Sequence, residues 1–326
     1  SLGSLIHHDR AISRLDFPAK GKLFSSAEDN TVAISRTRDW TVLSSIKAPI
    51  PKVQGRPSGD TAGPGETPAG INDFAIHPSQ KLMLSVGRGE RCLRLWNLMT
   101  GKKAGVLNFE RNLLEQVGEG KHSSGEGRRV LWDSEGENYT VAFERGAAVF
   151  GIDSKPKAVV KPFPPTKLHQ LRMVKLEERE LLAASTEDGR VLFYRIDGDH
   201  SEGSDEKLPA CPCVAQLGGR GAGVSGRIKD FEIISSKDTH SPVAVVVTAS
   251  SDGAVRLWSM SQDDVITESA SQAGKLIATL ETGSRITCMA AFMLDGVVGD
   301  SSKDGHGEVP GGVGLEEESS SSDDEE

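Results

Sequence analysis

Apolar residues alternate with small and polar residues in short runs that recur along this chain. In each copy an apolar run leads into a turn of small and acidic residues, and a second apolar run follows. The clear copies cover residues 23–35, 82–97, 181–194 and 245–258, and a weaker copy covers 139–151. Alternation with a period of two predicts strands, and Asp or Gly between two strands suits a tight hairpin turn.

Further alternating runs accompany each pair of predicted strands. One precedes each pair, at residues 12–17, 71–77, 129–132, 168–174 and 228–234, and a short one follows several pairs, at 42–46, 104–107 and 276–280. Four antiparallel strands per repeat are the blade of a β-propeller. Since no stretch shows convincing helical periodicity, βαβ folds are excluded. We therefore predict an all-β propeller of the WD40 type over residues 1–293.

The spacing of the repeats is uneven. The residues that match the terminal Trp of a WD blade are Ser35, Trp96, Gly151, Tyr194 and Trp258. They lie further apart than the roughly 40–45 residues of a WD blade would place them. The excess falls on polar or Pro/Gly-rich insertions at 49–70, 110–126, 197–212 and 260–274. We expect these insertions to decorate one ring.

Both ends of the repeat region carry a run without a partner. Leu2 to Ile6 is predicted to be an outer strand whose own blade lies upstream, and Ile286 to Phe292 a first strand without clear partners. Five blades and two orphan strands predict a seven-bladed ring in full, of which the N-terminal blades are missing. Residue 1 is Ser, so a processed or partial sequence is expected. Residues 294–326 are predicted to be a disordered acidic tail.

Charge is concentrated in that tail. The net charge is −9, and residues 316–326 hold seven acidic residues and no basic ones, which leaves the rest of the chain at −2. A nearly neutral body does not bind polyanions non-specifically, so any contact with nucleic acid needs a local patch. No apolar run reaches the roughly 18–20 residues of a membrane span. Cys92 and Cys288 are expected to be buried, and Cys211 and Cys213 to lie in a polar loop.

An ordered set of motifs resembles one WD-repeat family, the p21-activated-kinase-interacting protein 1-like family, whose yeast member is the maintenance-of-killer nucleolar protein. The set consists of Ser-Ala-Glu-Asp-Asn at 26–30, Ile-Asn-Asp-Phe-Ala-Ile-His-Pro-Ser at 71–79, Leu-Arg-Leu-Trp-Asn-Leu-Met-Thr at 93–100, Arg-Ile-Lys-Asp-Phe at 227–231 and Ser-Asp-Gly at 251–253. The resemblance covers about residues 2–293.

The resemblance implies a nuclear, nucleolar factor that acts through proteins in assembly of the large ribosomal subunit, and a second role in restraining a p21-activated kinase. The chain departs from the family in three ways. Ala69-Gly70 and Gly226-Arg227 stand where a Gly-His pair is expected, Ser35-Arg36 replaces Trp-Asp, and the tail is acidic where relatives often end in lysines. The missing His residues weaken the hydrogen-bond tetrad of those blades, which in a WD repeat consists of His, Ser or Thr, Asp and Trp.

Several side chains invite a chemical interpretation, but a structural role is preferred for each. Asp29, Asp188 and Asp252 fall in turns between blade strands, where a capping role is favoured over that of catalytic acids. Trp96, Trp258 and Tyr194 end apolar strands and are expected to pack within blades. His7-His8-Asp9 occupies the place of the structural His of a WD repeat rather than of a metal ligand.

No motif predicts an enzyme. Gly221, Gly223 and Gly226 match a dinucleotide fingerprint, but an alternating strand follows them where a helix is needed. No GxSxG, HExxH or P-loop pattern is present. We therefore expect no catalytic residue, no cofactor, no metal and no small-molecule substrate.

Two charged segments remain. Lys155, Lys157, Lys161 and Lys167, interleaved with prolines, form a basic cluster. It is interpreted as a solvated linker between blades, with contact to ribosomal RNA or an acidic partner as the alternative. Ser320, Ser321 and Ser322 each precede an acid by three residues, which suits an acidophilic kinase of the casein kinase 2 type; a merely solubilising tail is the other interpretation.

The leading hypothesis is thus a scaffold in assembly of the large (60S) ribosomal subunit in the nucleolus. Its partners would be ribosomal proteins and assembly factors of the precursor particle, without a membrane. An adaptor that binds and inhibits a p21-activated kinase is the alternative. A propeller enzyme with a site at the mouth of the ring is a third hypothesis, which no convergent polar motif supports.

Overall fold

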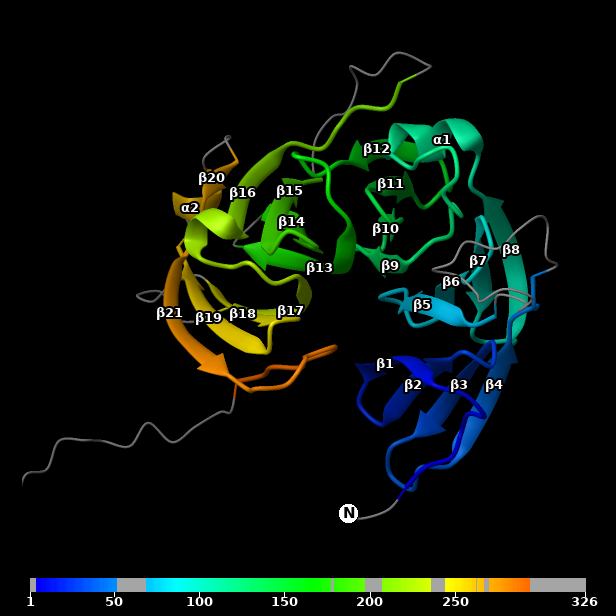
Figure 1. Ribbon diagram of the computed structural model, residues 1–326. Coiled ribbons are helices and arrows are strands. Elements are labelled where there is room, and N and C mark those ends of the chain that lie inside the picture. Colours follow the sequence, from blue (N-terminus) through cyan, green and yellow to red (C-terminus); the bar gives the residue numbers. More distant parts are fainter. Residues whose placement is uncertain are drawn as a thin grey trace, which may run out of the picture. The chain divides into compact units, whose positions relative to one another are not determined.

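The computed structural model describes residues 4–51, 69–176, 179–196, 207–235, 244–261, 263–266 and 270–293 (Figure 1). Parts of the predicted insertions at 49–70 and 197–212 fall outside these ranges. The predicted acidic tail, with Ser320, Ser321 and Ser322, also lies outside the described residues.

Five antiparallel sheets of the propeller follow one another along the chain, and each is one blade. Blade 1 contains β1 (Ile12–Ala19), β2 (Lys22–Ala27), β3 (Thr31–Arg36) and β4 (Val42–Lys47). Blade 2 contains β5 (Ile71–Ile76), β6 (Leu82–Gly87), β7 (Cys92–Asn97) and β8 (Lys102–Asn108). Blade 3 contains β9 (Arg129–Trp132), β10 (Asn138–Ala142), β11 (Ala147–Gly151) and β12 (Pro156–Val160). Blade 4 contains β13 (Leu168–Leu176), β14 (Arg179–Thr186), β15 (Arg190–Arg195) and β16 (Cys213–Gly218), and blade 5 contains β17 (Ile228–Ser235), β18 (Ala244–Ser250), β19 (Ala254–Met260) and β21 (Lys275–Glu281).

The first strands of the blades line the centre of the arrangement. β1 lies next to β5, β5 next to β9, β9 next to β13 and β13 next to β17 (Figure 1). One apolar cluster fills each interface between neighbouring blades; that between blades 1 and 2 contains Phe24, Ile34, Phe74 and Trp96. The other three clusters join blades 2 and 3, 3 and 4, and 4 and 5. The predicted WD-repeat propeller with five blades is confirmed.

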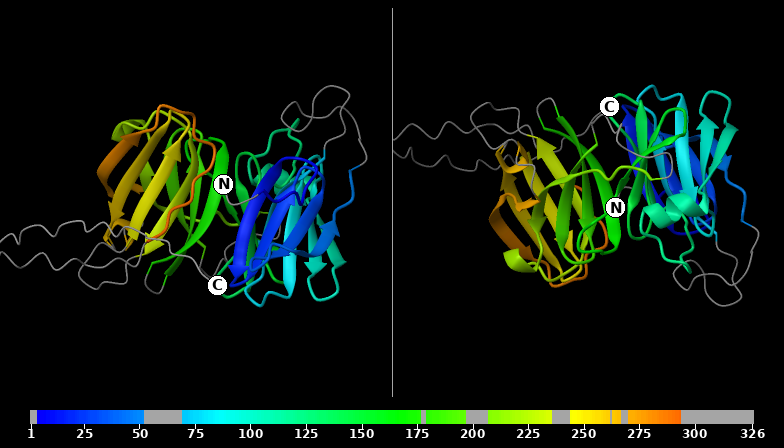
Figure 2. Two further views of the ribbon diagram at one scale, coloured as in Figure 1. Left: turned by 90° about the horizontal axis from the view of Figure 1, so that it is seen from below. Right: turned by 90° about the horizontal axis from the view of Figure 1, so that it is seen from above.

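One face of the propeller carries most of the features described below. In each blade the turn between the second and third strands and the connection to the next blade lie at the same end of the antiparallel strands. We call this the turn face; its second-to-third turns include residues 27–31, 143–146, 186–190 and 250–254. Figure 2 shows the blades edge-on, with connections at both ends of the strands.

Two insertions extend the sheets of the preceding blades. Residues of the insertion at 197–212 pair with the outer strand of blade 3, since the Val159 N–H donates to the Pro209 carbonyl (2.9 Å) and the Cys211 N–H to the Val159 carbonyl (2.8 Å). In the insertion at 260–274, β20 (Ser271–Gln272) pairs in parallel with β16 of blade 4. Each insertion thus leaves the third strand of one blade and covers the edge of the blade before it.

The structure departs from the sequence-based expectation at two helices. The insertion at 110–126 contains α1 (Arg111–Gln116), which buries Leu113 and Leu114 against blades 2 and 3. Only one turn and a half of helix forms, which is too short for helical periodicity to appear in the sequence. The short helix α2 (Asp263–Ile266) lies in the insertion at 260–274.

The two predicted orphan strands are not strands among the described residues. Residues 4–6 and 286–292 adopt no regular structure, because the described residues supply no neighbouring strand with which they could exchange hydrogen bonds. Residue 289 nevertheless takes the place of an inner strand. The Met289 N–H donates to Asp230 Oδ2 (3.0 Å), as the Val130 N–H of β9 donates to Asp73 Oδ2 (2.9 Å).

The cysteines also differ from expectation. Cys92 is buried as predicted, but Cys288 is exposed because residues 286–292 are not covered by a further sheet. Cys211 is buried within the segment that pairs with β12, and this burial raises the pKa of its thiol to about 12. Cys213 is partly buried and begins β16 rather than lying in a loop.

Candidate functional site

The turn of blade 1 is held by a hydrogen-bond network around Asp29. Asp29 Oδ1 accepts from the Thr31 N–H (2.9 Å) and the Thr31 hydroxyl (2.6 Å), and Asp29 Oδ2 lies 3.2 Å from His8 Nδ1. His8 Nε2 is 2.8 Å from the Ser25 hydroxyl. Partial burial alone would raise the pKa of Asp29, but the hydrogen bonds from Thr31 outweigh it and hold that pKa below its usual value. The carboxylate therefore stays charged and caps the turn.

Asp188 and Asp252 make comparable contacts in blades 4 and 5. Asp188 Oδ1 accepts from the Thr186 hydroxyl (2.6 Å), and its Oδ2 pairs with Arg190 (2.6 Å). Asp252 Oδ1 accepts from the Ala254 N–H (3.0 Å). In both cases burial would raise the pKa, but hydrogen bonds lower it overall, from Arg190 to Asp188 and from the Ala254 N–H to Asp252.

The tetrad expected of a WD blade is divided between blades. Blade 1 has the His8, Ser25 and Asp29 part, but Ser35 replaces the Trp, and the Ser35 hydroxyl is buried without a partner in the described structure. Blades 2 and 5 have the other part, in which Trp96 Nε1 donates to the Ser85 hydroxyl (2.8 Å) and Trp258 Nε1 to the Thr248 hydroxyl (3.1 Å).

Blade 4 lacks both parts, and blade 5 lacks the His. His8 lies four residues before β1, the first strand of blade 1. The equivalent positions are occupied by Pro164 before β13 of blade 4 and by Val224 before β17 of blade 5. Tyr194 takes the place of the Trp, and its side chain is almost fully buried. Burial raises the pKa of Tyr194 far above its usual range, and its hydroxyl has no partner among the residues that the structure describes.

Charged residues of the inner strands tie neighbouring blades together. Asp73 on β5 is 1% exposed; its Oδ1 pairs with Arg14 of β1 (3.0 Å) and its Oδ2 accepts the Val130 N–H of β9 (2.9 Å). The charge of Asp73 raises the pKa of Arg14 despite burial of the guanidinium. Asp230 on β17 repeats this arrangement with Arg172 of β13 (3.2 Å). We call these two contacts the inter-blade clamps.

Cations gather where the inner strands of blades 3, 4 and 5 begin on the turn face. We call this group the cationic mouth; it consists of the basic residues Arg128, Arg129, Lys167, Arg227 and Lys229 and of His169, which they surround. Burial, and then the nearby charges of Lys229 and Arg227, lower the pKa of His169 to about 4. Burial and the charge of Arg227 lower the pKa of Lys229. The inner strands β9, β13 and β17 lie side by side, and Arg128 and Lys167 both pair with Glu144, so the basic side chains lie on one small surface.

Two glutamates of the adjacent turns offset part of this charge. Glu144 lies 2.6 Å from Lys167 Nζ and 3.6 Å from Arg128, and Glu187 lies 3.3 Å from Arg227. The His169 ring nitrogen Nε2 is buried and has no hydrogen-bond partner in the described part of the chain. The mouth therefore keeps a positive balance and an unsatisfied donor or acceptor.

The basic cluster predicted at 155–167 is not one patch. Its residues flank β12, so Lys155 and Lys161 are separated by the length of that strand, roughly 20 Å at about 3.3 Å per residue. Lys155 and Lys157 lie at the end opposite the turn face, beside Asp153 (3.6 Å) and Asn138 (2.6 Å) respectively. Lys161 and Lys167 lie at the turn face, and Lys167 belongs to the cationic mouth. Part of the expected linker is thus a blade strand.

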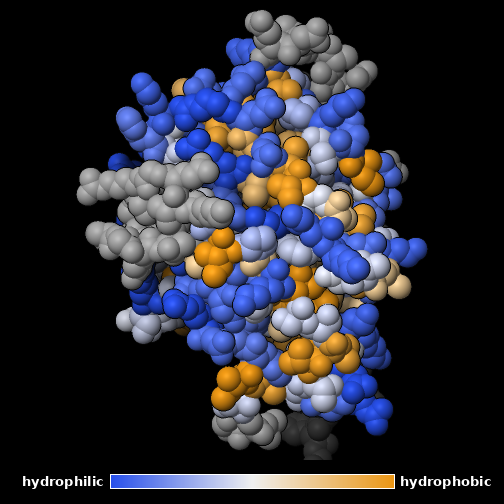
Figure 3. Space-filling view, turned by 90° about the vertical axis from the view of Figure 1, so that its right-hand side faces the viewer, coloured by the Kyte–Doolittle hydropathy of each residue, from blue (hydrophilic) through white to orange (hydrophobic). Residues whose placement is uncertain are grey.

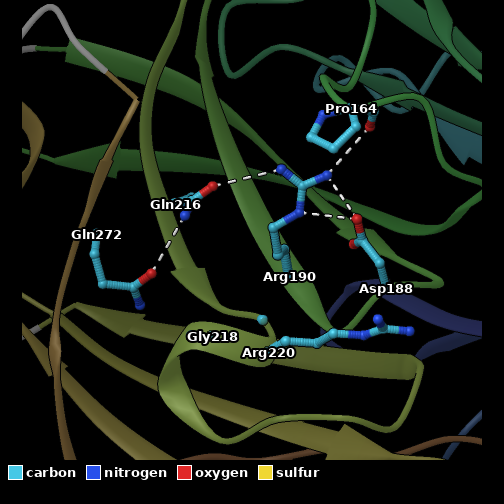
Figure 4. Close-up of a pocket in the computed structure, with 9 residues that line it drawn as sticks. Pro164, Asp188, Arg190, Gln216, Gly218, Arg220 and Gln272 are labelled. Carbon is cyan, nitrogen blue, oxygen red and sulfur yellow. Dashed lines mark hydrogen bonds and ion pairs between the residues drawn. The ribbon is translucent and has the colours of Figure 1, made fainter.

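A hollow of about 460 Å³ opens on the turn face of blade 4 (Figure 4). It is lined by Pro164, Asp188, Arg190, Gln216, Gln272 and the glycine-rich stretch 218–221. Arg190 is anchored by Asp188 and by the carbonyls of Phe163 (2.8 Å) and Pro164 (3.2 Å). The stretch contains only the three-residue 3-10 helix η1 (Arg220–Ala222), and β17 follows it, so the described residues do not offer the α-helix N-terminus that a dinucleotide site would need.

No group of three or more His, Cys, Asp or Glu side chains suited to a metal occurs in the described ranges. None of the helices in these ranges has the length and apolar character needed to cross a membrane. Sequence reasoning missed the inter-blade clamps and most of the cationic mouth. The available signal was a charged residue inside otherwise apolar inner strands, such as Asp73 within Ile-Asn-Asp-Phe at 71–74.

Comparison with known proteins agrees with this architecture. The family model "WD domain, G-beta repeat" matches residues 1–34. A Danio rerio protein named "p21-activated protein kinase-interacting protein 1-like" is 26% identical over 291 residues, which are 89% of this chain and 62% of the relative. "Protein MAK11" of Saccharomyces cerevisiae is 25% identical over 315 residues, covering 88% of this chain and 64% of the relative.

A third relative, "Shk1 kinase-binding protein 15" of Schizosaccharomyces pombe, is 26% identical over 69% of this chain and 50% of its own length. The chain thus spans about three-fifths of the length of the first two relatives. A chain of the "Crystal Structure of Mitotic Checkpoint Complex" has the same fold, with a TM-score of 0.56, 12% identity, and coverage of 85% of this chain and 67% of that one. The chain is therefore a WD-repeat β-propeller homologous to the proteins named p21-activated protein kinase-interacting protein 1-like and to yeast MAK11.

Proposed function

We propose that this protein is a non-enzymatic, protein-binding scaffold in assembly of the large ribosomal subunit in the nucleolus. Similarity to MAK11 over most of the chain supports this setting, because the family resemblance implies a nucleolar assembly factor. Its partners would be ribosomal proteins and assembly factors of the precursor particle. The propeller would hold them on its blade edges and faces, without a cofactor, metal or small-molecule substrate.

The observation that carries the proposal is that the outer strands of some blades are left uncovered. The outer strands of blades 3 and 4 are covered by the chain's own insertions, whereas β4, β8 and β21 end their sheets. Exposed apolar side chains lie along these three edges. They include Val42 (46%), Leu43 (50%) and Val106 (45%) on β4 and β8, and Ile277 (54%) and Leu280 (65%) on β21. Figure 3 shows apolar patches on the side of the molecule that carries β4 and β8. An open edge with apolar side chains suits a protein partner that adds a strand or packs on it.

The test is purification of the tagged chain from cells, followed by identification of the bound proteins and RNA. We expect precursor-particle proteins with the unmodified chain and their loss with Leu43→Glu/Val106→Glu. A matched control is Met99→Glu/Ile152→Glu, which places the same two charges on exposed apolar residues in the turns between the third and fourth strands of blades 2 and 3. An eluate without ribosomal proteins, or equal loss with the control, would overturn the proposal.

A second candidate function is that of an adaptor that binds and restrains a p21-activated kinase. The names of the Danio rerio and Schizosaccharomyces pombe relatives favour it, since both refer to a kinase interaction. The same purification separates the two: a kinase without ribosomal proteins in the eluate supports the adaptor.

A further inference from the structure

The cationic mouth concentrates positive charge on rigid elements of the fold. Its six side chains come from the first strands of three successive blades and from the residues just before them, so the rigid sheets hold them together. Like charges at this distance repel one another, and Glu144 and Glu187 compensate only part of the charge. A bound anion would remove this repulsion and could offer an acceptor to His169 Nε2, which has no partner in the described structure.

An exposed aromatic residue lies on the segment that leads into the mouth. Phe163 is 86% exposed, and it lies four residues before Lys167 in the connection between β12 and β13 on the turn face. An exposed Phe next to cations is the arrangement by which proteins stack the bases of a single strand while they bind its phosphates. An acidic peptide would form ion pairs with the cations but has no base to stack on the ring.

The hollow of blade 4 continues this surface. Pro164, which follows Phe163, lines the hollow, and the Arg190 guanidinium spans from the Pro164 carbonyl to Asp188 (Figure 4). The amides of Gln216 and Gln272 lie side by side in its wall. Amide groups both donate and accept, so they can pair with the edge of a base.

We propose that the cationic mouth, Phe163 and the hollow of blade 4 together bind a short segment of single-stranded RNA. The phosphates lie at the mouth, on Arg128, Arg129, Lys167, Arg227 and Lys229. One base stacks on Phe163, and the next enters the hollow beside Gln216 and Gln272. The inference deepens the proposed scaffold function, and rests on it only for the choice of RNA as the anion.

The experiment is a titration of the purified full chain with a short fluorescein-labelled oligouridylate, followed by fluorescence anisotropy at several salt concentrations. We expect Arg227→Gln/Lys229→Gln to weaken binding by tenfold or more at low salt. For single strands each lost phosphate contact lowers the slope of log K against log salt by about 0.7, so the double variant lowers it by about 1.4. Phe163→Ala should weaken binding about tenfold and leave the salt slope unchanged.

The matched control is Lys155→Gln/Lys157→Gln, which removes two charges from the opposite face and should leave binding unchanged. A polyglutamate peptide and inorganic phosphate serve as competitors, and circular dichroism checks that each variant keeps its strands. Equal weakening by the control, equal affinity for polyglutamate with no effect of Phe163→Ala, or full competition by millimolar phosphate would overturn the proposal. Because only purified protein is used, such a failure leaves the outcome of the cellular purification untouched.

Discussion

Removal of the Asp73 carboxylate should destabilise the propeller more than any other single change of charge in blade 2. Asp73→Ala leaves the Arg14 guanidinium without its ion pair and the Val130 N–H without its acceptor. Breaking a buried pair costs about 3–5 kcal/mol, and a buried N–H without an acceptor about 1–3 kcal/mol. The Arg14 side chain is 28% exposed, so water recovers part of the first cost. We expect a net loss of about 4 kcal/mol.

The assay is thermal and denaturant unfolding, in which this loss corresponds to a fall of about 10 °C in Tm. The double variant Arg14→Met/Asp73→Ala removes both charges and should lose less than Asp73→Ala alone, because no uncompensated cation remains. Glu115→Ala is the control, since Glu115 pairs with Arg111 at 2.8 Å on the open surface and should give no measurable change. If Asp73→Ala loses no more than the control, or no more than the double variant, the clamp does not stabilise the blades.

Three further outcomes follow from the turn-face contacts. Trp258→Phe removes the N–H that donates to Thr248 and should cost about 1–2 kcal/mol in thermal unfolding; a loss no larger than that of the exposed Trp40→Phe would contradict this. His8→Ala should cost about 1–2 kcal/mol and speed hydrogen exchange in the turn between β2 and β3, so unchanged protection there would count against the network. The pKa of His169 is lowered to about 4, so between that value and its usual 6.5 the unfolded chain binds more protons and stability falls as pH falls. His169→Gln should remove about 1 kcal/mol of that pH dependence in denaturant unfolding, after allowance for partial exposure, and an identical pH profile would refute the assignment.

The blades were predictable because successive side chains of a strand point to opposite faces of its blade, which gives the sequence a period of two. The same local signal placed Asp29, Asp188 and Asp252 in turns, where their carboxylates now accept hydrogen bonds from the turn itself. Helix α1 was missed because six residues with two buried leucines do not form a helical pattern. The edge pairing of the insertions was missed because no property of an insertion tells which neighbour it will meet.

The cationic mouth illustrates why sites are harder to predict than blades. Arg128 and His169 are about 40 residues apart in the sequence, and His169 and Lys229 are 60 residues apart. They come together only because the inner strands of neighbouring blades lie side by side. Lys155 and Lys161 are neighbours in the sequence, yet β12 carries them to opposite faces. Closeness in the sequence therefore suggested a single patch for the lysines at 155–167, which the fold divides. The cationic mouth was missed because its residues are distant in the sequence.

The insertions that cover the edges of blades 3 and 4 bear on how the propeller comes apart. A row of repeats unfolds as a chain of units joined to their neighbours, and the weakest junction opens first. Main-chain hydrogen bonds run from blade 4 to the edge of blade 3 and from blade 5 to the edge of blade 4, in addition to the apolar contacts between them. Blades 1 and 2 share only side-chain and inner-strand contacts in the described structure. Under force or heat, blade 1 should therefore separate first, while blades 3 to 5 persist as one cooperative block.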